Sequence, residues 1–399
     1  MDNKKNGIPK LRFPGFTGAW EQRRFKDISK LSQGLQIAIS KRFTHPGDGK
    51  LFYITNEFLN PNSTVKYYID SPTKNVIAEK TDILMTRTGN TGKVVTDVEG
   101  VYHNNFFKIS YNSSKIDRWF LYYLLNSYPI QREILVRAGN STIPDLNHND
   151  FYGIKIYIPT IEEQIKIGTF LTKVDSLIAL HQRKLEHLQE QKKGLLQKMF
   201  PKNGETVPEV RFPGFTDAWE QRKLGDYLSI PTKEPITDIN ELKLMTLKLN
   251  LEGITLTANR ETLKLGATKY YKRHEGQLLY GKQNFFHGSI ALIPKEAEGY
   301  ATSGDVPALD ISNVNGKYLV DYISRPSYFK AKEALATGTG SKRIHEKTLL
   351  NFKITVPSLE EQNAISDFIT NYTNLITLHQ RKLDHLELMK KGLLQQMFV

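Results

Sequence analysis

Residues 158–200 read IPTIEEQIKIGTFLTKVDSLIALHQRKLEHLQEQKKGLLQKMF, and residues 356–398 read VPSLEEQNAISDFITNYTNLITLHQRKLDHLELMKKGLLQQMF. The two stretches align without a gap at an offset of 198, and 25 of their 43 positions are identical. A second pair, RFPGFTGAWEQRRF at 12–25 and RFPGFTDAWEQRKL at 211–224, agrees at 11 of 14 positions. The chain is therefore a tandem duplication with two copies of about 200 residues each.

Each long repeat predicts one helix. Thr160 with Glu163, and Ser358 with Glu361, fit the S/T-x-x-E capping box at a helix N-terminus. Apolar positions then recur at alternating spacings of 3 and 4, which is the pattern of a coiled coil. We therefore expect the two helices to pack on each other, and the long path between them allows an antiparallel pair. The predicted helix-pairing seam consists of Leu171, Val174, Ile178, His181, Leu185, Leu188, Ile369, Tyr372, Ile376, His379, Leu383 and Leu386.

The middle segments, roughly 26–157 and 225–355, share little identity, and only fragments such as Ile143 and Ile344 can be matched. Both are rich in Tyr, Phe, Ile and Val between Gly and Pro residues, which indicates short strands joined by loops. Segments such as 118–127 add helices. Each middle is therefore predicted to be an α+β globule. We expect the repeated ends to have the same function in both copies, and the two middles to have different functions.

The composition favours a nucleic-acid partner. The chain has 55 Lys and Arg against 42 Asp and Glu, a net charge of +13, and the excess lies mainly in the two long segments 1–158 and 201–356. The absence of cysteine excludes disulfides and Cys-based zinc sites. No apolar stretch approaches the ~18 residues of a membrane span, and the N-terminus lacks a secretory signal. We expect a cytoplasmic protein with no membrane partner.

Motifs of catalysis and metal binding are missing from the sequence. There is no Walker A motif, no Gly-rich cofactor turn after a strand, no Asn/Asp-Pro-Pro-aromatic methyltransferase motif and no HExxH. The stretch GNTGK at 89–93 lacks the spacing of a phosphate-binding loop. His181 and His379 allow a metal pair or a pH switch, but we favour polar seam residues that fix the register. The expectation is a chain without a catalytic site, a metal or a cofactor of its own.

Polar loops in both middles are candidates for reading DNA. Base reading needs side chains with paired donors and acceptors, and phosphate contacts need Lys, Arg and backbone N–H groups. An ordinary turn between strands is the alternative for any one of these loops. The candidates in the first middle are Arg87, Thr88, Asn90, Thr91, Lys93, Asn104, Asn105, Asn140, Ser141 and Thr142. Those in the second are Lys282, Gln283, Asn284, His287, Ser341, Lys342 and Arg343.

The RFPGF segments mark the start of each middle. Pro at the second and Gly at the third position suit a turn, and Phe13, Phe16 and Trp20 are candidates for the core. We interpret the segment as structural. Arg12 and Arg211 are kept as candidates for contacts to the backbone or to a partner.

The duplicated pattern resembles the specificity subunit of a Type I restriction–modification enzyme. The shared features are Trp20-Glu21 and Trp219-Glu220, the divergent middles, the I/V-P-x-I/L-E-E-Q helix starts and the H-Q-R-K-L and K-K-G-L-L-Q-x-M-F helix ends. The resemblance covers the whole chain. It implies two target-recognition domains, each binding one half of a bipartite, asymmetric site in double-stranded DNA. It also implies antiparallel helices that set the distance between the domains.

The resemblance further implies partner subunits. Two methyltransferase subunits would bind the helices, and two restriction (motor–nuclease) subunits would complete the complex. S-adenosylmethionine, ATP and Mg²⁺ would belong to those partners. On this basis we expect a pseudo-twofold arrangement with domains at 1–157, 158–200, 201–355 and 356–399. The alternatives are a stand-alone architectural or regulatory DNA-binding protein and, less favoured, a stand-alone nuclease.

Overall fold

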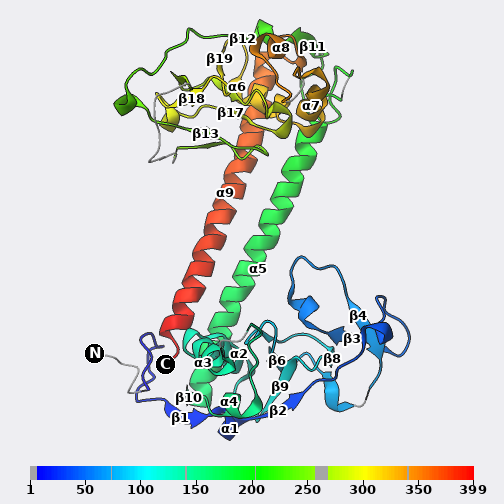
Figure 1. The fold of residues 1–399 in the computed structure, drawn as a ribbon, viewed down its shortest axis with the longest axis vertical. Helices are drawn as coiled ribbons and strands as arrows, with labels where there is room; N and C mark the ends of the chain where they lie inside the picture. Colours follow the sequence, from blue (N-terminus) through cyan, green and yellow to red (C-terminus); the bar gives the residue numbers. More distant parts are fainter. Residues whose placement is uncertain (1–6, 73, 140–141, 203, 257–267, 339–340) are drawn as a thin grey trace. The chain divides into compact units, whose positions relative to one another are not determined.

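The computed structural model describes residues 7–399 except 73, 140–141, 203, 257–267 and 339–340. Its contacts divide the chain into two compact units. Unit 1 consists of Met1–Arg183 with Gln380–Val399, and unit 2 of Lys184–His379. Each unit holds one globular part and portions of both long helices, so the helices belong to both units (Figure 1).

The globular part of unit 1 is built on two small sheets and a strand pair. The first sheet has the antiparallel order β2 (Ser29–Gln33), β9 (Phe106–Tyr111), β6 (Ile83–Thr86) and β7 (Val94–Val95). The second has the order β4 (Tyr67–Asp70), β3 (Lys50–Ile54), β8 (Gly100–Tyr102) and β5 (Ile77–Ala78), with β3 and β8 parallel. β1 (Glu21–Arg24) pairs with β10 (Lys155–Ile158) and brings the ends of the globule together.

Short helices complete unit 1. Asp117 caps α2 by accepting from the Phe120 backbone N–H at 2.8 Å, and Pro129 stands in the first turn of α3, where a missing N–H costs nothing. The helices are α1 (Phe25–Ile28), α2 (Arg118–Asn126), α3 (Tyr128–Ala138) and α4 (His148–Tyr152), with 3₁₀ turns η2 (Ile39–Lys41), η3 (Asn56–Leu59) and η4 (Lys74–Val76).

Unit 2 repeats this plan with shorter strands. One sheet has the order β12 (Leu228–Ser229), β19 (Ala308–Ile311), β16 (Leu278–Tyr280) and β17 (Ile290–Leu292). The other strand pairs are β13 (Thr246–Leu247) with β14 (Ile254–Thr255), β15 (Tyr270–Lys272) with β18 (Ala301–Ser303), and β11 (Glu220–Lys223) with β20 (Lys353–Val356). Its helices are α6 (Gly316–Ile323), α7 (Pro326–Phe329) and α8 (Glu346–Leu350), with 3₁₀ turns η5 (Leu224–Asp226), η6 (Ile239–Glu241), η7 (Phe285–His287), η8 (Lys295–Ala297) and η9 (Lys330–Leu335).

Two long helices, α5 (Ile161–Lys198) and α9 (Leu359–Gln396), follow the globular parts. In unit 1 the Lys390 ammonium of α9 lies 2.6 Å from the Asp175 carboxylate of α5, so the end of one helix accompanies the first half of the other. In unit 2 the end of α5 lies beside the beginning of α9, because Phe200, just after α5, shares a core with Ile369 of α9. The helices are therefore antiparallel, and the predicted α+β class with long paired helices is confirmed (Figure 1). None of the helices in the described ranges combines the length and apolarity needed to span a bilayer.

The predicted seam residues occupy the covered side of both helices. Leu171, Val174, Leu185, Leu188, Ile369 and Leu383 are buried, and Ile178, His181, Tyr372, Ile376, His379 and Leu386 are half-buried. The spacing of 3 and 4 in the sequence thus coincides with the spacing of burial along each helix. The assignment of these residues to helix pairing remains a prediction.

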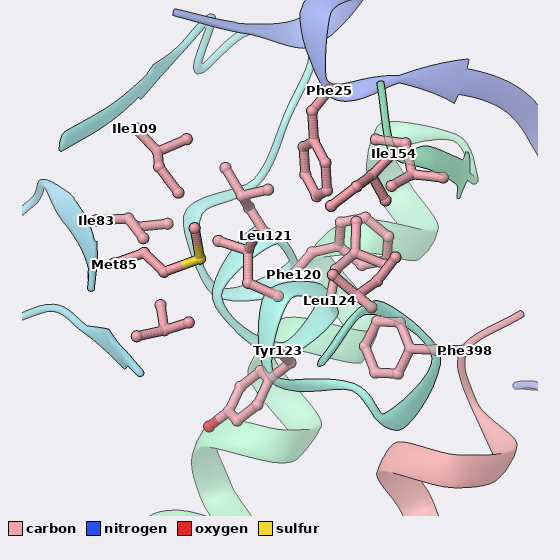
Figure 2. Close-up of a cluster of buried hydrophobic side chains, with 14 of the residues drawn as sticks. Phe25, Ile83, Met85, Ile109, Phe120, Leu121, Tyr123, Leu124, Ile154 and Phe398 are labelled. Atoms are coloured by element: carbon pink, nitrogen blue, oxygen red, sulfur yellow. The ribbon is translucent and has the colours of Figure 1, made fainter. Parts of the chain in front are cut away.

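Each long helix ends inside the core of the opposite copy. Phe398 packs edge-on against Trp20 with ring centroids 6.4 Å apart. It also tilts against Phe120 with centroids 5.7 Å apart, and both rings lie in the cluster shown in Figure 2. Phe200 makes the corresponding contacts in unit 2, with Trp219 at 6.2 Å and Tyr318 at 5.5 Å. Burying such rings contributes a large share of the free energy of folding. The repeated M-F ends are therefore core residues of the globular parts.

Equivalent ion pairs connect the RFPGF segment of each copy to the first turn of the long helix in the same copy. Arg12 donates from Nε and Nη2 to the two oxygens of Glu163 at 2.7 and 2.8 Å. Arg211 and Glu361 form the same pair at the same distances. Ser358 Oγ accepts from the Glu361 backbone N–H at 3.3 Å, as the capping box predicts, but the glutamate carboxylates are bound to the arginines. The capping-box interpretation was thus wrong for the carboxylates, because a bidentate arginine competes for them.

The glutamine of the E-E-Q motif connects each helix to the globule beside it. Gln164 Oε1 accepts from the Asp117 backbone N–H at 3.0 Å, at the start of α2. Gln362 Oε1 accepts from the Asn315 backbone N–H at 2.9 Å, at the start of α6. The repeated E-E-Q motif therefore forms the same contact between helix and globular part in both copies.

Candidate nucleic-acid interface

Three of the predicted polar loops meet in unit 1. The Arg87 backbone N–H donates to the Asn105 carbonyl at 2.7 Å, and the Leu146 N–H donates to the Arg87 carbonyl at 2.9 Å. Thr88 forms an isolated antiparallel bridge with Asp145. The loop after β6 is therefore held between the β8–β9 turn and the segment before α4.

Side chains reinforce this meeting of loops. Arg87 Nη2 lies 2.6 Å from Asp145 Oδ2, and Thr91 Oγ1 donates to the Pro144 carbonyl at 2.6 Å. Gly89 has φ +85°, a conformation that favours glycine, and a Cβ there would displace the Asn56 amide, whose Nδ2 would lie 2.3 Å away. Asn90 and Lys93 are exposed beside it. The loop is therefore hydrogen-bonded at its base and presents polar groups at its tip.

Sequence reasoning missed three further residues at this surface, namely Gln33, Gln36 and Asn56. Asn104 Nδ2 donates to Gln36 Oε1 at 3.1 Å, Gln33 Nε2 donates to the Asn104 carbonyl at 3.1 Å, and Asn56 Nδ2 donates to the Thr88 carbonyl at 3.2 Å. Asn56 follows β3 and Asn104 follows β8, and neighbouring parallel strands end at the same edge. Because that pairing joins distant parts of the sequence, no local pattern signalled it.

Unit 2 builds the same backbone arrangement from different residues. The Lys282 N–H donates to the Asp305 carbonyl at 2.8 Å, and the Ile344 N–H donates to the Lys282 carbonyl at 2.8 Å. Lys282 therefore occupies the position of Arg87. Ile344 corresponds to the buried Leu146, 198 residues earlier, which corrects the sequence match with the exposed Ile143.

Charged pairs dominate the side chains of the unit 2 surface. Lys282 Nζ lies 3.0 Å from Glu346 Oε1, and Arg343 Nη1 lies 3.3 Å from Asp305 Oδ1. When the Gln283 amide is turned so that its oxygen faces Arg343, that oxygen accepts from Arg343 Nε at 3.1 Å and from Nη2 at 2.6 Å. The segment around Asp305, which sequence reasoning did not select, is thus part of this surface.

Arg273 lies beneath the unit 2 surface. Its side chain donates to Thr302 Oγ1 at 2.9 Å, and burial lowers its pKa to about 10, so the guanidinium remains charged at neutral pH. It lines a cavity of about 110 Å³ together with Lys233, Lys282 and Glu346. A cavity of about 690 Å³ lies next to it, lined by residues 244–247, 268–271 and 302–306.

The remaining candidates lie around these loops or cannot be placed. Asn284 immediately precedes η7, His287 ends it and is exposed, and Ser341 and Lys342 are exposed next to Arg343. Thr142 is exposed in unit 1. Asn140 and Ser141 lie outside the described residues. Among the residues that the structure describes, no group of three or more His, Asp or Glu side chains is placed to hold a metal ion.

Comparison with known families decides the classification. The sequence pattern of the type I restriction modification DNA specificity domain matches residues 18–190 and again residues 217–388. The chain belongs to this family. Its members are the non-catalytic DNA-recognition subunits of type I restriction systems, and the two matches coincide with the two copies of the tandem repeat.

Relatives of this specificity subunit cover most or nearly all of its length. The type I restriction enzyme MjaVIII specificity subunit of Methanocaldococcus jannaschii is 24% identical over 393 residues, which covers 94% of this chain and 91% of the relative. The putative MjaX specificity subunit of the same organism is 25% identical over 313 residues, 73% of this chain and 69% of the relative. The crystal structure of the S subunit from M. genitalium has a TM-score of 0.63 at 14% identity and covers 98% of this chain and 99% of that one. That likeness shows a shared fold.

Proposed function

We propose that this specificity subunit reads a bipartite, asymmetric site in double-stranded cytoplasmic DNA, one half with each globular part. The observation that carries the proposal is the backbone arrangement of Arg87 with Asn105 and Leu146, repeated by Lys282 with Asp305 and Ile344. The two surfaces share a frame but carry different side chains. Different half-sites require that combination.

The chemistry of both surfaces suits DNA. Amide and cationic side chains on loops match the donors and acceptors of base edges in the major groove, and the net charge of +13 suits the phosphate backbone. We assign base reading to residues 1–157 and 201–355. The helical segments 158–200 and 356–399 then set the spacing between the half-sites.

The long helices carry exposed leucines at equivalent positions. Leu177 and Leu375 are 45% and 44% exposed, and Leu180 and Leu378 are 54% and 46% exposed. All four lie off the covered seam, and each pair is separated by the repeat offset of 198. Exposed apolar side chains grouped on a surface favour a protein partner. We infer that two copies of a methyltransferase subunit dock there, and through them two motor–nuclease subunits.

This assignment leaves the chemistry to the partners. S-adenosylmethionine would be bound by the methyltransferase subunits, and ATP and Mg²⁺ by the motor–nuclease subunits. The specificity subunit binds the DNA site and positions a methyltransferase subunit at a defined base.

A methylation map of the host genome with and without this gene tests the function. We expect one split motif with a fixed gap that disappears with the gene. Replacing residues 26–157 with the corresponding segment of another family member should change one half of the motif and leave the other half and the gap intact. Absence of any split motif, or a change in both halves, would contradict the proposal.

Docking is tested by the Leu177→Glu/Leu180→Glu and Leu375→Glu/Leu378→Glu pairs. Native mass spectrometry of the wild-type complex should give two methyltransferase copies per chain, and each pair should remove one. The exposed Leu335→Glu variant, outside the long helices, is the matched control and should retain two. Retention of both copies by the helix variants would place docking elsewhere.

A further inference from the structure

The surface of unit 1 is rich in side-chain amides. We call Gln33, Gln36, Asn56, Asn104 and Asn105 the amide cluster, because they contact one another or the Arg87–Thr88 backbone. Gln36 is exposed, and its carboxamide is oriented by the Asn104 Nδ2 donor at 3.1 Å. Its own Nε2 donor is left on the exposed end of the side chain.

Several polar atoms of this surface are buried without a partner. Within the described residues, six buried side-chain nitrogen or oxygen atoms lack a hydrogen bond, and three of them are Asn56 Oδ1, Asn104 Oδ1 and Arg87 Nε. Buried polar groups are normally paired, so a concentration of unpaired ones needs an explanation. Because these three atoms have almost no exposed surface, the group that can approach a ligand here is the exposed carboxamide of Gln36, which Asn104 orients.

The positions of unit 2 that correspond to Asn56, Asn104 and Asn105 carry no amides. The parallel bridge between Leu244 and Ala301 matches the pairing of Tyr53 with Val101, so Leu247 stands where unit 1 has Asn56. By the same register, Gly304 and Asp305 replace Asn104 and Asn105. The amide-filled region of unit 1 therefore corresponds to the cavities of unit 2.

Cations line the smaller of those cavities instead. Lys233, Arg273, Lys282 and Arg343 form what we call the cation cluster, and the first three line the cavity of about 110 Å³. Arg343 is 38% exposed and pairs with the exposed Asp305 at 3.3 Å. Arg343 also donates from Nε and Nη2 to the turned Gln283 amide at 3.1 and 2.6 Å. In unit 1 Arg87 is 22% exposed and pairs with Asp145 at 2.6 Å, and its Nε has no partner.

Amides and cations prefer different bases. A side-chain amide offers one donor and one acceptor, which match N7 and the N6 amino group of adenine. Arginine and lysine offer donors alone, which match O6 and N7 of guanine. We propose that the amide cluster reads adenine in one half-site, through Gln36 oriented by Asn104, and that the cation cluster reads guanine in the other, through Arg343. This inference rests on the proposed function of the two units.

Modified DNA tests the inference on the unaltered complex with its methyltransferase subunits. 7-Deazaadenine and 7-deazaguanine each remove N7, so each replaces one acceptor at one position of a duplex carrying the wild-type motif. The exchange of residues 26–157 identifies which half belongs to unit 1. We expect 7-deazaadenine to weaken binding in the unit 1 half, and 7-deazaguanine in the unit 2 half, each by roughly fivefold to a hundredfold. Sensitivity in the opposite pattern would overturn the inference.

Variants test the named residues. Gln36→Ala should relax one A·T position of the unit 1 half in the methylation map, while Asn62→Ala, an exposed amide in the same unit, should not. Arg343→Gln should shift one position of the unit 2 half from guanine toward adenine, and Lys295→Ala should leave the motif unchanged. If the wild-type complex has a split motif but these variants keep it, the base assignment fails and the proposed function stands. If there is no split motif, the proposed function itself fails.

Discussion

Arg12 and Arg211 show how single residues fix the frame. Each forms a bidentate pair with a glutamate whose side chain is only 1% exposed, and that hydrogen bond raises the pKa of each arginine. Removing one partner of a buried pair leaves an uncompensated charge, which costs about 3–5 kcal/mol. We expect Arg12→Ala to lower the free energy of unfolding of unit 1 by that amount, and Arg211→Ala that of unit 2, measured by urea denaturation.

The double variants Arg12→Met/Glu163→Gln and Arg211→Met/Glu361→Gln are informative controls. Because no charge is left buried, they should be much more stable than the single arginine variants. Arg222→Ala removes a pair between exposed side chains and should barely move the urea midpoint. Equal destabilisation by the single and double variants would show that packing, rather than charge, holds the joint.

His274 gives unit 2 a pH-dependent contact. Its Nδ1 lies 2.8 Å from Glu298 and its Nε2 lies 2.9 Å from Glu234, and these bonds raise the pKa of the imidazole. A raised pKa means that protonation favours the folded state. The contribution is complete below the unfolded pKa of about 6.5 and is lost as the pH rises through the folded value.

The measurement is the thermal stability of wild type and His274→Gln between about pH 5.5 and 8. The difference between the two proteins should be largest at the acidic end and shrink toward pH 8. A constant difference across this range would mean that the imidazole contributes by packing and not by charge.

Sequence reasoning selected candidate residues only where the local sequence chemistry was enough. Arg87 and Lys282 stood in polar loops rich in glycine, and the structure places both at corresponding positions of the candidate surfaces. Asn56 gave no local signal, because its place at this surface arises from the pairing of β3 with β8. Gln33 gave none either, because its contact with Asn104 depends on the pairing of β2 with β9. The partner of Arg12 lies 151 residues away, beyond any motif.

Among the elements, the long helices were the most predictable. Their burial follows the heptad positions from Leu171 onward, so periodicity alone located them. The strands of unit 2 were harder because several have two or three residues, too few to show alternation. Their positions depend on neighbouring strands and on buried rings such as Tyr280 and Tyr318.

If the paired helices set the half-site spacing, their length should control the gap in the DNA motif. Four residues inserted into α5 within 186–191, and four into α9 at about the facing level, 374–379, add one turn, ~6 Å. An insertion of four is a stutter that a coiled coil accommodates by local unwinding. We expect the gap to lengthen by about one or two base pairs, at 3.4 Å each, in the methylation map.

The same four residues inserted into the exposed turn at 60–64 of unit 1 provide the control, since they leave both helices intact. That variant should keep the gap and both half-sites. An unchanged gap in the helix variant, with methylation retained, would show that something other than helix length sets the spacing.

At the scale of the whole molecule, equivalent backbone contacts connect the first residues of each copy to the end of a long helix. The Leu11 N–H donates to the Gln396 carbonyl at 2.9 Å in unit 1, and the Val210 N–H donates to the Lys198 carbonyl at 3.0 Å in unit 2. The first contact joins the two ends of the chain without a covalent link, whereas residues 201–209 make that link in the second. A linker copied from 201–209 should therefore connect Phe398 to residue 11 without strain.

The test is a circular permutant that begins at residue 210, carries this copied linker after Phe398 and ends at Phe200. Both globular parts keep their core rings, because Phe398 and Phe200 remain in place. We expect the permutant to fold, to bind the methyltransferase subunits and to direct the same methylation motif. A permutant opened between Phe120 and Leu124, inside the core of unit 1, should fail to fold. Loss of the motif in the first permutant with its fold retained would mean that the order of the copies, and not only the frame, carries information.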